Sequence, residues 1–159
     1  MTTPALLVFI CAHNACRSAI AEVIATAEAS RRGLPLEVQS AGTHALPGYA
    51  AASIAQATIS EIGLSLERHR SKPANADLIS RAALVVTMTD AQREMLHTVF
   101  PKDREKVVSF DDLTRQGDVP DPIGGEAEEV RAVRDMLQAS MPTIFTELEH
   151  RVKSGSKPT

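Results

Sequence analysis

The sequence predicts an α/β fold, a three-layer sandwich in which a four-stranded parallel sheet carries helices on both faces. Strand-like apolar segments alternate with segments of helical periodicity, and this alternation implies right-handed crossovers between parallel strands. Residues 82–88 form an almost continuously apolar run, which is typical of a strand buried on both faces. A chain of 159 residues suffices for a single core. We therefore expect one domain over residues 1–153, followed by a disordered tail at 154–159.

The bulk composition excludes several classes of partner. A net charge of −3 gives no general attraction to nucleic acid or to an anionic membrane, so any affinity for anions must be local. No apolar run is long enough to cross a bilayer, and residues 1–4 lack the basic start of a secretory signal. We therefore expect a cytoplasmic protein with neither nucleic-acid nor membrane partners. The spacing of histidines and cysteines fits no zinc site, and we expect no metal and no cofactor.

The first half of the chain predicts two strands, each followed by a helix. Residues 6–10 predict the first strand, and Ser18 opens a helical pattern that ends in a basic turn before Gly33. A second strand is expected at 36–41 and a second helix at 50–62. The first helix should bury the apolar residues that share one of its faces, which are Ile20, Val23, Ile24 and Ala27.

The middle of the chain predicts two more strands. A helical turn at 76–81 leads to the apolar strand at 82–88. Thr89 and Gln92 form a capping-box pattern that opens a short helix, and a fourth strand is expected at 107–110. The apolar residues that this helix should present to the core are Met95, Leu96 and Val99.

The last third of the chain predicts a loop and a long helix. Residues 117–125 combine glycine, proline and aspartate, which is typical of a turn-rich loop. From Ala127 a helical stripe of apolar residues follows, and Pro142 should kink that helix. The stripe consists of Val130, Val133, Leu137, Met141, Ile144, Leu148 and Val152.

The segment CAHNACRS joins the first strand to the first helix and carries reactive side chains. Cys11 and Arg17 are six residues apart, which lets the loop curl until its backbone N–H groups point inward and the guanidinium closes the ring. Such a ring holds a tetrahedral oxyanion such as phosphate and favours the thiolate of Cys11 over the thiol. An isolated cysteine is more often a buried structural thiol, but this strand–loop–helix setting favours a nucleophile aimed at phosphorus.

The same reaction requires a general acid. A thiolate that displaces a phosphate ester leaves an alkoxide or phenoxide, which departs poorly unless it is protonated. The candidates are Asp118 and Asp121, and Asp121 is favoured because Pro122 restricts its loop. Asp118 is interpreted as a turn residue or as a charge that supports the site from behind, and turn chemistry is also the alternative for Asp121.

These residues resemble the hallmark of the low-molecular-weight protein tyrosine phosphatases, a Cys-x5-Arg-Ser loop after the first strand. The chain departs from that pattern at His13, where the family usually has glycine, and at Ala19, where proline is usual. The resemblance implies a flavodoxin-like sandwich, a phosphocysteine intermediate, a phosphorylated protein or peptide as substrate, and Asp121 as the acid. The expected phosphate-binding residues are Ala12, His13, Asn14, Ala15, Cys16 and Ser18.

Other polar residues should hold this loop open. Asn14 suits a left-handed backbone position and can bond across the loop, while the Ser18 hydroxyl can donate to the Cys11 thiolate. By the resemblance, Ser40 and His69 stand where the family completes this network. Cys16 lies in the same curled loop and is expected to protect Cys11 by forming a disulfide with it under oxidation.

Two other functions remain open at this point. The His13–Asn14 pair and the Arg-x-x-Arg-Asp run at 131–135 also fit a related arsenate reductase. Thioredoxin-coupled reductases relay a disulfide through further cysteines, and this chain has none after Cys16, so only a version with a small-thiol cofactor remains. A flavodoxin-like module that binds a mononucleotide phosphate is the third alternative, although the chain has no tryptophan and one tyrosine for stacking.

Two positions bear on the substrate. Eukaryotic members that favour phosphotyrosine have a branched aliphatic residue two positions before the loop arginine and aromatic residues after the Asp-Pro pair. Here these places hold Ala15 and the run Ile123, Gly124 and Gly125, so selectivity for an aromatic ring should be weak. Bacterial protein-arginine phosphatases resemble the chain in the Gly-Gly pair and the long closing helix, but they carry threonine in place of Ala15. Phosphotyrosine is therefore the expected substrate, with phosphoarginine as an open alternative.

Overall fold

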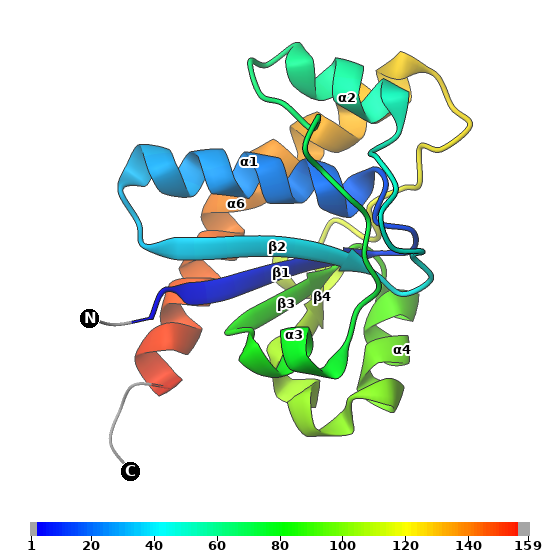
Figure 1. Ribbon diagram of the computed structural model, residues 1–159. Helices are drawn as coiled ribbons and strands as arrows, with labels where there is room; N and C mark the ends of the chain where they lie inside the picture. Colours follow the sequence, from blue (N-terminus) through cyan, green and yellow to red (C-terminus); the bar gives the residue numbers. More distant parts are fainter. Residues whose placement is uncertain (1–2, 156–159) are drawn as a thin grey trace.

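The computed structural model describes residues 3–155 and has the expected α/β architecture (Figure 1). Four parallel strands form one sheet in the order β2-β1-β3-β4. The two central strands, β1 and β3, have a neighbouring strand on each edge. Their side chains are buried on both faces of the sheet, which accounts for their apolar sequences. The strands are β1 (Ala5–Cys11), β2 (Leu36–Gly42), β3 (Leu84–Thr87) and β4 (Val107–Ser109).

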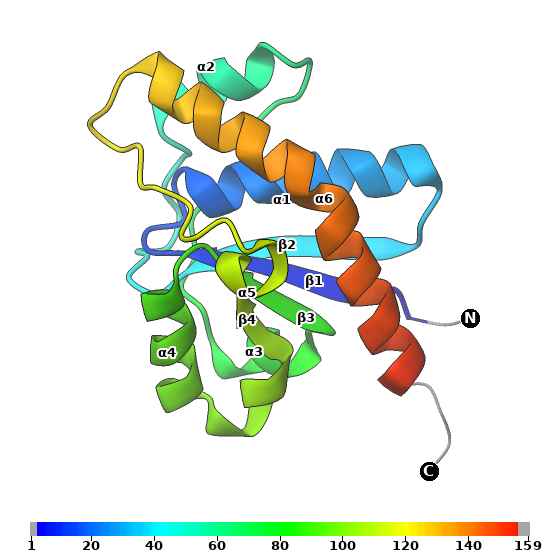
Figure 2. The same ribbon diagram turned by 180° about the vertical axis from the view of Figure 1, so that it is seen from behind.

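Helices cover both faces of the sheet, as predicted. On one face α1 packs against α6, and α2 packs on α6 beyond the sheet; α3 and α4 lie on the opposite face (Figures 1 and 2). These helices are α1 (Arg17–Arg32), α2 (Ser53–Ser60), α3 (Ala76–Arg81), α4 (Asp90–Val99) and α6 (Ala127–Gly155).

The central strand β1 divides the core into two parts. Successive side chains of a strand point to opposite faces, so alternate residues of β1 enter different clusters. Leu7, Phe9 and Cys11 belong to the cluster under α1 and α6. Leu6, Val8 and Ile10 belong to the cluster under α3 and α4. The period-2 alternation therefore aims the Cys11 side chain toward the α1 side of the sheet.

The fourth strand is shorter than predicted because a helix begins inside the predicted strand. The Ser109 side chain accepts from the backbone N–H of Asp112, and the Asp112 carboxylate accepts from the N–H of Ser109. This capping box opens α5 (Phe110–Thr114), so Phe110 is a helical core residue. The sequence analysis also missed the 3-10 helix at Pro101–Lys106, which proline at its first position favours.

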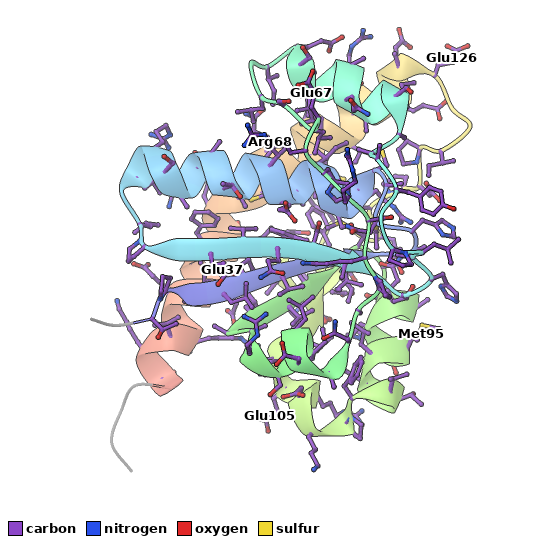
Figure 3. The ribbon with its side chains drawn as sticks, in the orientation of Figure 1. Glu37, Glu67, Arg68, Met95, Glu105 and Glu126 are labelled. Atoms are coloured by element: carbon purple, nitrogen blue, oxygen red, sulfur yellow. The ribbon has the colours of Figure 1, made fainter. Side chains whose placement is uncertain are left out.

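The capping box at Thr89 and Gln92 is confirmed, but the predicted apolar face of α4 is wrong. Leu96 is buried, whereas Met95 is 38% and Val99 is 58% exposed. Figure 3 shows Met95 pointing away from the body of the protein. The buried face of this helix runs through Gln92 and Leu96, four residues apart, because Gln92 must lie inward to complete the cap.

The long helix α6 carries the predicted apolar stripe from Val130 to Leu148, but Val152 is 40% exposed. Pro142 lies inside the helix, and α6 changes direction about half-way along in Figure 2, as expected where a proline removes a backbone hydrogen bond. Ser154 and Gly155 are helical, so the tail predicted at 154–159 begins too early. The rest of that predicted tail lies outside the described residues. The second helix, expected at 50–62, spans only Ser53–Ser60.

Candidate active site

The candidate site lies at the carboxyl end of β1, where sites on parallel sheets form. Cys11 is the last residue of β1, and α1 begins at Arg17 after a loop of five residues. Figure 1 shows the loops after β1 and β2 and the yellow segment before α6 gathered at this end of the sheet. Residues from three separate stretches of the sequence therefore meet here.

Cys11 and Ser18 are paired at the base of the loop. Their Sγ and Oγ atoms are 2.9 Å apart, a hydrogen bond in which either atom can be the donor. Both residues are buried, and Cys11 is 3% exposed. When Cys11 is a thiolate, the Ser18 hydroxyl is the group positioned to donate to it.

Asn14 is the central hydrogen-bonding residue of the loop. Its φ of 57° lies in the left-handed region, as predicted, where asparagine is tolerated better than most residues. Its Nδ2 donates to Ser18 Oγ at 2.8 Å and to Ser40 Oγ at 2.9 Å, and its Oδ1 accepts from the N–H of Lys72 at 3.1 Å. Its carbonyl accepts from His69 Nε2 at 2.7 Å. The side chains of Asn14 and Ser18 thus lie behind the loop, with the predicted Ser40 and His69 beside them.

Glu22 extends this network and was missed by the sequence analysis. Ser40 Oγ donates to Glu22 Oε1 at 2.7 Å while accepting from Asn14. Glu22 lies on α1, one turn beyond Ser18. A signal was available, because Glu22 is the first acidic residue of a helix whose preceding positions are small, apolar or basic.

Gly42 allows the loop after β2 to cross the loop after β1. The backbone N–H groups of Thr43 and His44 donate to the carbonyls of Cys11 and Ala12 at 3.0 and 2.8 Å. A Cβ atom at Gly42 would lie 2.4 Å from the Ala12 carbonyl oxygen, a distance that no side chain tolerates. Glycine is therefore required at this crossing.

Arg17 joins the loop after β1 to the loop that carries the candidate acid. It is 5% exposed, and its Nη1 donates to the Val119 carbonyl at 3.1 Å. Its Nη2 lies 3.7 Å from Asp121 Oδ2, and the Asp121 side chain is 48% exposed. The other carboxylate oxygen of Asp121 accepts from the N–H of Ile123 at 3.1 Å. The guanidinium therefore lies between Cys11's loop and the carboxylate.

Asp118 is placed differently from Asp121. Its Oδ1 accepts from the backbone N–H of Asp90, the first residue of α4, at 3.0 Å. An acidic side chain at a helix N-terminus is stabilised by the helix dipole. Asp118 is thus occupied in holding its loop against α4, and it does not line the pocket described next.

A small pocket brings the predicted reactive residues together. Its lining consists of Cys11, His13, Ala15, Cys16, Arg17, Asp121 and Ile123. His13 is exposed and borders the opening. The sequence analysis had mentioned Ile123 only as a position that lacks the aromatic residue of phosphotyrosine-selective members; the structure places it in the pocket lining. Ala12 is half-buried and contributes its carbonyl to His44.

Cys16 remains protonated over the whole neutral range. Burial raises the pKa of its thiol from 9.0 to about 12, and the charges of Cys11 and Asp121 act in the same direction while Arg17 opposes them. Both cysteines are free and buried. The surroundings of Cys16 therefore keep this thiol neutral.

Among residues 3–155 no group of three or more histidine, cysteine, aspartate or glutamate side chains is arranged to hold a metal ion. No helix in this part of the chain is long and apolar enough to cross a membrane.

Comparison with known proteins identifies the family. A family model described as low molecular weight phosphotyrosine protein phosphatase matches residues 6–154. The chain belongs to this family. This low molecular weight phosphatase is 32% identical over 145 residues to the protein-arginine-phosphatase of Bacillus subtilis strain 168, covering 90% of this chain and 96% of that protein. It is also 32% identical over 134 residues to the protein-tyrosine-phosphatase Wzb of Escherichia coli K12, covering 84% of this chain and 88% of that protein.

Solved structures of the phosphatase family share the fold. A YwlE arginine phosphatase, a cysteine-to-serine mutant with a phosphorylated active-site serine, superimposes with a TM-score of 0.85 at 32% identity, covering 91% of this chain and 95% of that chain. The low molecular weight protein tyrosine phosphatase from T. tengcongensis superimposes with a TM-score of 0.86 at 28% identity, covering 90% of this chain and 99% of that chain.

Proposed function

We propose that this chain is a protein phosphatase that hydrolyses phosphotyrosine through a phosphocysteine intermediate. The observation that carries the proposal is the single pocket in which Cys11, Arg17 and Asp121 meet. A nucleophile, an anion-binding guanidinium and an acid in one pocket are the three groups that phosphoester displacement requires.

In the first step Cys11 attacks phosphorus. The phosphoryl oxygens rest on the loop at 12–16 and on Arg17, which stabilises the charge that develops in the transition state. The S–P bond forms as the P–O bond to the leaving group breaks, and Asp121 gives its proton to the departing oxygen. Ser18 stabilises the Cys11 thiolate before the attack. Once the S–P bond has formed, the sulfur no longer carries that charge.

In the second step water attacks the phosphocysteine. The Asp121 carboxylate takes a proton from this water, the new P–O bond forms, and the S–P bond breaks to release inorganic phosphate and the Cys11 thiolate. The half-exposed position of Asp121 lets water reach it for this role. Asn14, Ser40 and His69 hold the loop in the conformation that both steps use.

The pocket rim bears on substrate selectivity. Ala15 and Ile123 stand where aromatic or branched walls would clamp a flat ring, so we propose that phosphotyrosine is accepted with weak selectivity and that phosphoarginine competes with it. Relatives with either name are about equally similar to this chain, at 32% identity. A side-by-side measurement of kcat/KM on phosphotyrosine and phosphoarginine peptides tests this, and a strong preference for phosphotyrosine would contradict it.

Arsenate reduction is not favoured. The arginines of the run at 131–135 are occupied elsewhere, because Arg131 and Arg134 both pair with Glu61 of the α2 end at 2.8 Å. Among the described residues this run lines none of the active-site pocket. Both cysteines of the chain lie in one loop, so no further thiol can relay a disulfide.

The proposed partners follow from the chemistry. We propose phosphorylated proteins or peptides as substrates, with phosphate and other tetrahedral oxyanions as competing ligands of the loop. We also propose a cytoplasmic location, because a reducing compartment keeps the two thiols of the loop in the reduced form that catalysis needs.

The Cys11→Ser variant tests the mechanism. We expect it to lose turnover of an aryl phosphate completely while it retains affinity for inorganic phosphate, because the loop and Arg17 remain. Turnover is measured by phenolate release, and phosphate affinity by calorimetry. Hydrolysis at the parent rate would show that Cys11 is not the nucleophile.

A further inference from the structure

A second hollow lies beside the active-site pocket, on the other side of the loop that carries Asp121. We call it the α6 groove; its volume is about 350 Å³. Three residues of α6 form one wall, which are Ala132, Val133 and Met136, and Pro120 and Pro122 form the other. Asp121 lines both the groove and the pocket, so the two hollows are neighbours across this one residue.

Carboxylates border this otherwise apolar groove. Glu129 lines it together with Asp121. The Glu129 carboxylate lies against Gly125, where a Cβ atom would meet its Oε2 at 1.9 Å, so the absence of a side chain at Gly125 makes room for it. Within residues 3–155 no lysine or arginine forms an ion pair with Glu129 or with the nearby Glu126, which Figure 3 shows pointing away from the start of α6.

We propose that the α6 groove binds a lysine or arginine side chain next to the phosphorylated residue of a peptide substrate, an inference that rests on the proposed function. Lysine and arginine lay their aliphatic stems along apolar surface and keep the charged head at a polar edge. The groove offers that combination, with apolar walls and a Glu129 carboxylate at the rim. A purely apolar occupant would instead remove water from the Glu129 carboxylate without pairing it.

The position of the groove fits a residue close to the phosphorylated one. An extended peptide advances about 3.3 Å per residue, so a neighbour one or two positions away passes over the Asp121 loop when the phosphoryl group is in the pocket. The cationic head pairs with Glu129 rather than Asp121, because Asp121 already faces Arg17 and accepts from the N–H of Ile123. Asp121 remains available as the acid.

Peptide substrates with single replacements test this proposal. Phosphotyrosine peptides carry lysine, norleucine, alanine or glutamate at each of the two positions on either side of the phosphotyrosine, in an otherwise neutral background. We expect one position at which kcat/KM is highest for lysine, lower for norleucine and lowest for alanine and glutamate. The advantage of lysine over norleucine should be about three- to fivefold, the size of an exposed ion pair.

Three variants assign the effect to the groove. For each variant the kcat/KM of one peptide is divided by that of another on the same enzyme, so that changes in basal turnover cancel. Glu129→Gln should remove the advantage of lysine over norleucine and keep that of norleucine over alanine. Ala132→Leu fills the groove and should remove both. Glu128→Gln makes the same charge change on the same helix turn outside the groove and should preserve both.

The outcomes separate this proposal from the proposed function. Equal turnover of all the peptides, or a lysine advantage that survives Glu129→Gln, would overturn the groove proposal alone. A preference for norleucine over lysine at every position would also overturn it. Failure to hydrolyse any of the peptides would overturn the proposed function and this inference with it.

Discussion

In the loop between Cys11 and Ser18 most side chains are buried, and Asn14 alone takes part in four hydrogen bonds. The loop at 117–125 is largely exposed, and its attachments include the buried Val119, the Asp118 contact with α4 and the approach of Asp121 to Arg17. The first loop is built to hold charge in a fixed geometry. The second presents Asp121, the proposed proton donor, to solvent. Substitutions in the two loops should therefore separate stability from catalysis.

The largest expected effect comes from a substitution of Asp121 in the exposed loop, and it should lower the rate of catalysis without lowering stability. Asp121→Asn should slow esters with poor leaving groups by about 10²- to 10⁴-fold, because the departing oxygen then receives no proton. Esters with good leaving groups should lose far less, and the free energy of unfolding should change by less than about 0.5 kcal/mol. The measurement is kcat for a series of aryl phosphates.

The neighbouring acid provides the control for Asp121. Asp118→Asn keeps an oxygen that can accept from the Asp90 N–H, and we expect no dependence of its effect on the leaving group. Equal losses for good and poor leaving groups in Asp121→Asn would mean that Asp121 has only a structural role.

In the buried loop a substitution should affect both properties. Asn14→Ala removes the donor to the Ser18 and Ser40 hydroxyls and leaves the Lys72 N–H without its acceptor. It also removes a residue suited to the left-handed backbone. We expect a loss of about 10²-fold in kcat and of about 1–3 kcal/mol in the free energy of unfolding. Chemical denaturation and aryl phosphate turnover measure the two.

The asparagine at the start of α3 is the matched control. Asn75 accepts from the N–H of Leu78 as a helix cap and does not line the pocket. Asn75→Ala should cost about 1 kcal/mol of stability and no activity. If Asn14→Ala were only as harmful to catalysis as Asn75→Ala, the hydrogen bonds of Asn14 would be irrelevant to the site.

A smaller effect is expected one step further from the loop. The Glu22 carboxylate accepts from Ser40 and does not line the pocket, so it acts as a positioning residue. Glu22→Ala should lower kcat about tenfold, at the low end for a supporting group, while Glu22→Gln keeps an accepting oxygen and should restore most of the rate. Glu28→Ala removes a partly buried carboxylate of the same helix, which pairs with Arg31 and Arg32, and serves as the control. Identical rates for Glu22→Ala and Glu22→Gln would exclude the proposed hydrogen bond.

The smallest expected effect concerns the protection of Cys11 against peroxide by Cys16, rather than the rate of turnover. Peroxide converts Cys11 to a sulfenic acid, which the Cys16 thiolate can attack to form a disulfide with release of water. Because the pKa of Cys16 is about 12, its thiolate fraction rises with pH through the neutral and mildly alkaline range. The fraction of activity that a thiol restores after peroxide should therefore be greater at pH 9 than at pH 7. Cys16→Ser should remove this dependence; an unchanged recovery in that variant would contradict the role.

Local chemistry made most of the fold predictable. The alternation along β1, the capping box at Thr89 and the left-handed Asn14 each follow from a residue and its near neighbours in sequence. The errors arose where two local rules compete. Phe110 continues an apolar run, yet Ser109 and Asp112 cap a helix there, and the apolar periodicity of α4 did not reveal that Gln92 takes an inward place.

The candidate site was predictable as a set of reactive residues but not as a geometry. Cys11, Arg17 and Asp121 could be chosen by their chemistry. The contact of Ser40 with Glu22 and the crossing of Gly42 over Ala12 depend on how two strand ends pack together, and no spacing in the sequence encodes them. The same holds for Arg131 and Arg134, whose pairing with Glu61 joins residues that are about seventy positions apart.

The hydrogen bond from Arg17 to the Val119 carbonyl joins residues 102 positions apart. During synthesis the cysteine-bearing loop leaves the ribosome long before the segment that anchors its arginine. A nascent or truncated chain that ends before Val119 therefore has the proposed nucleophile but lacks the proposed acid and the acceptor that orients the guanidinium. The chain becomes competent for chemistry only when its last third has folded onto its first.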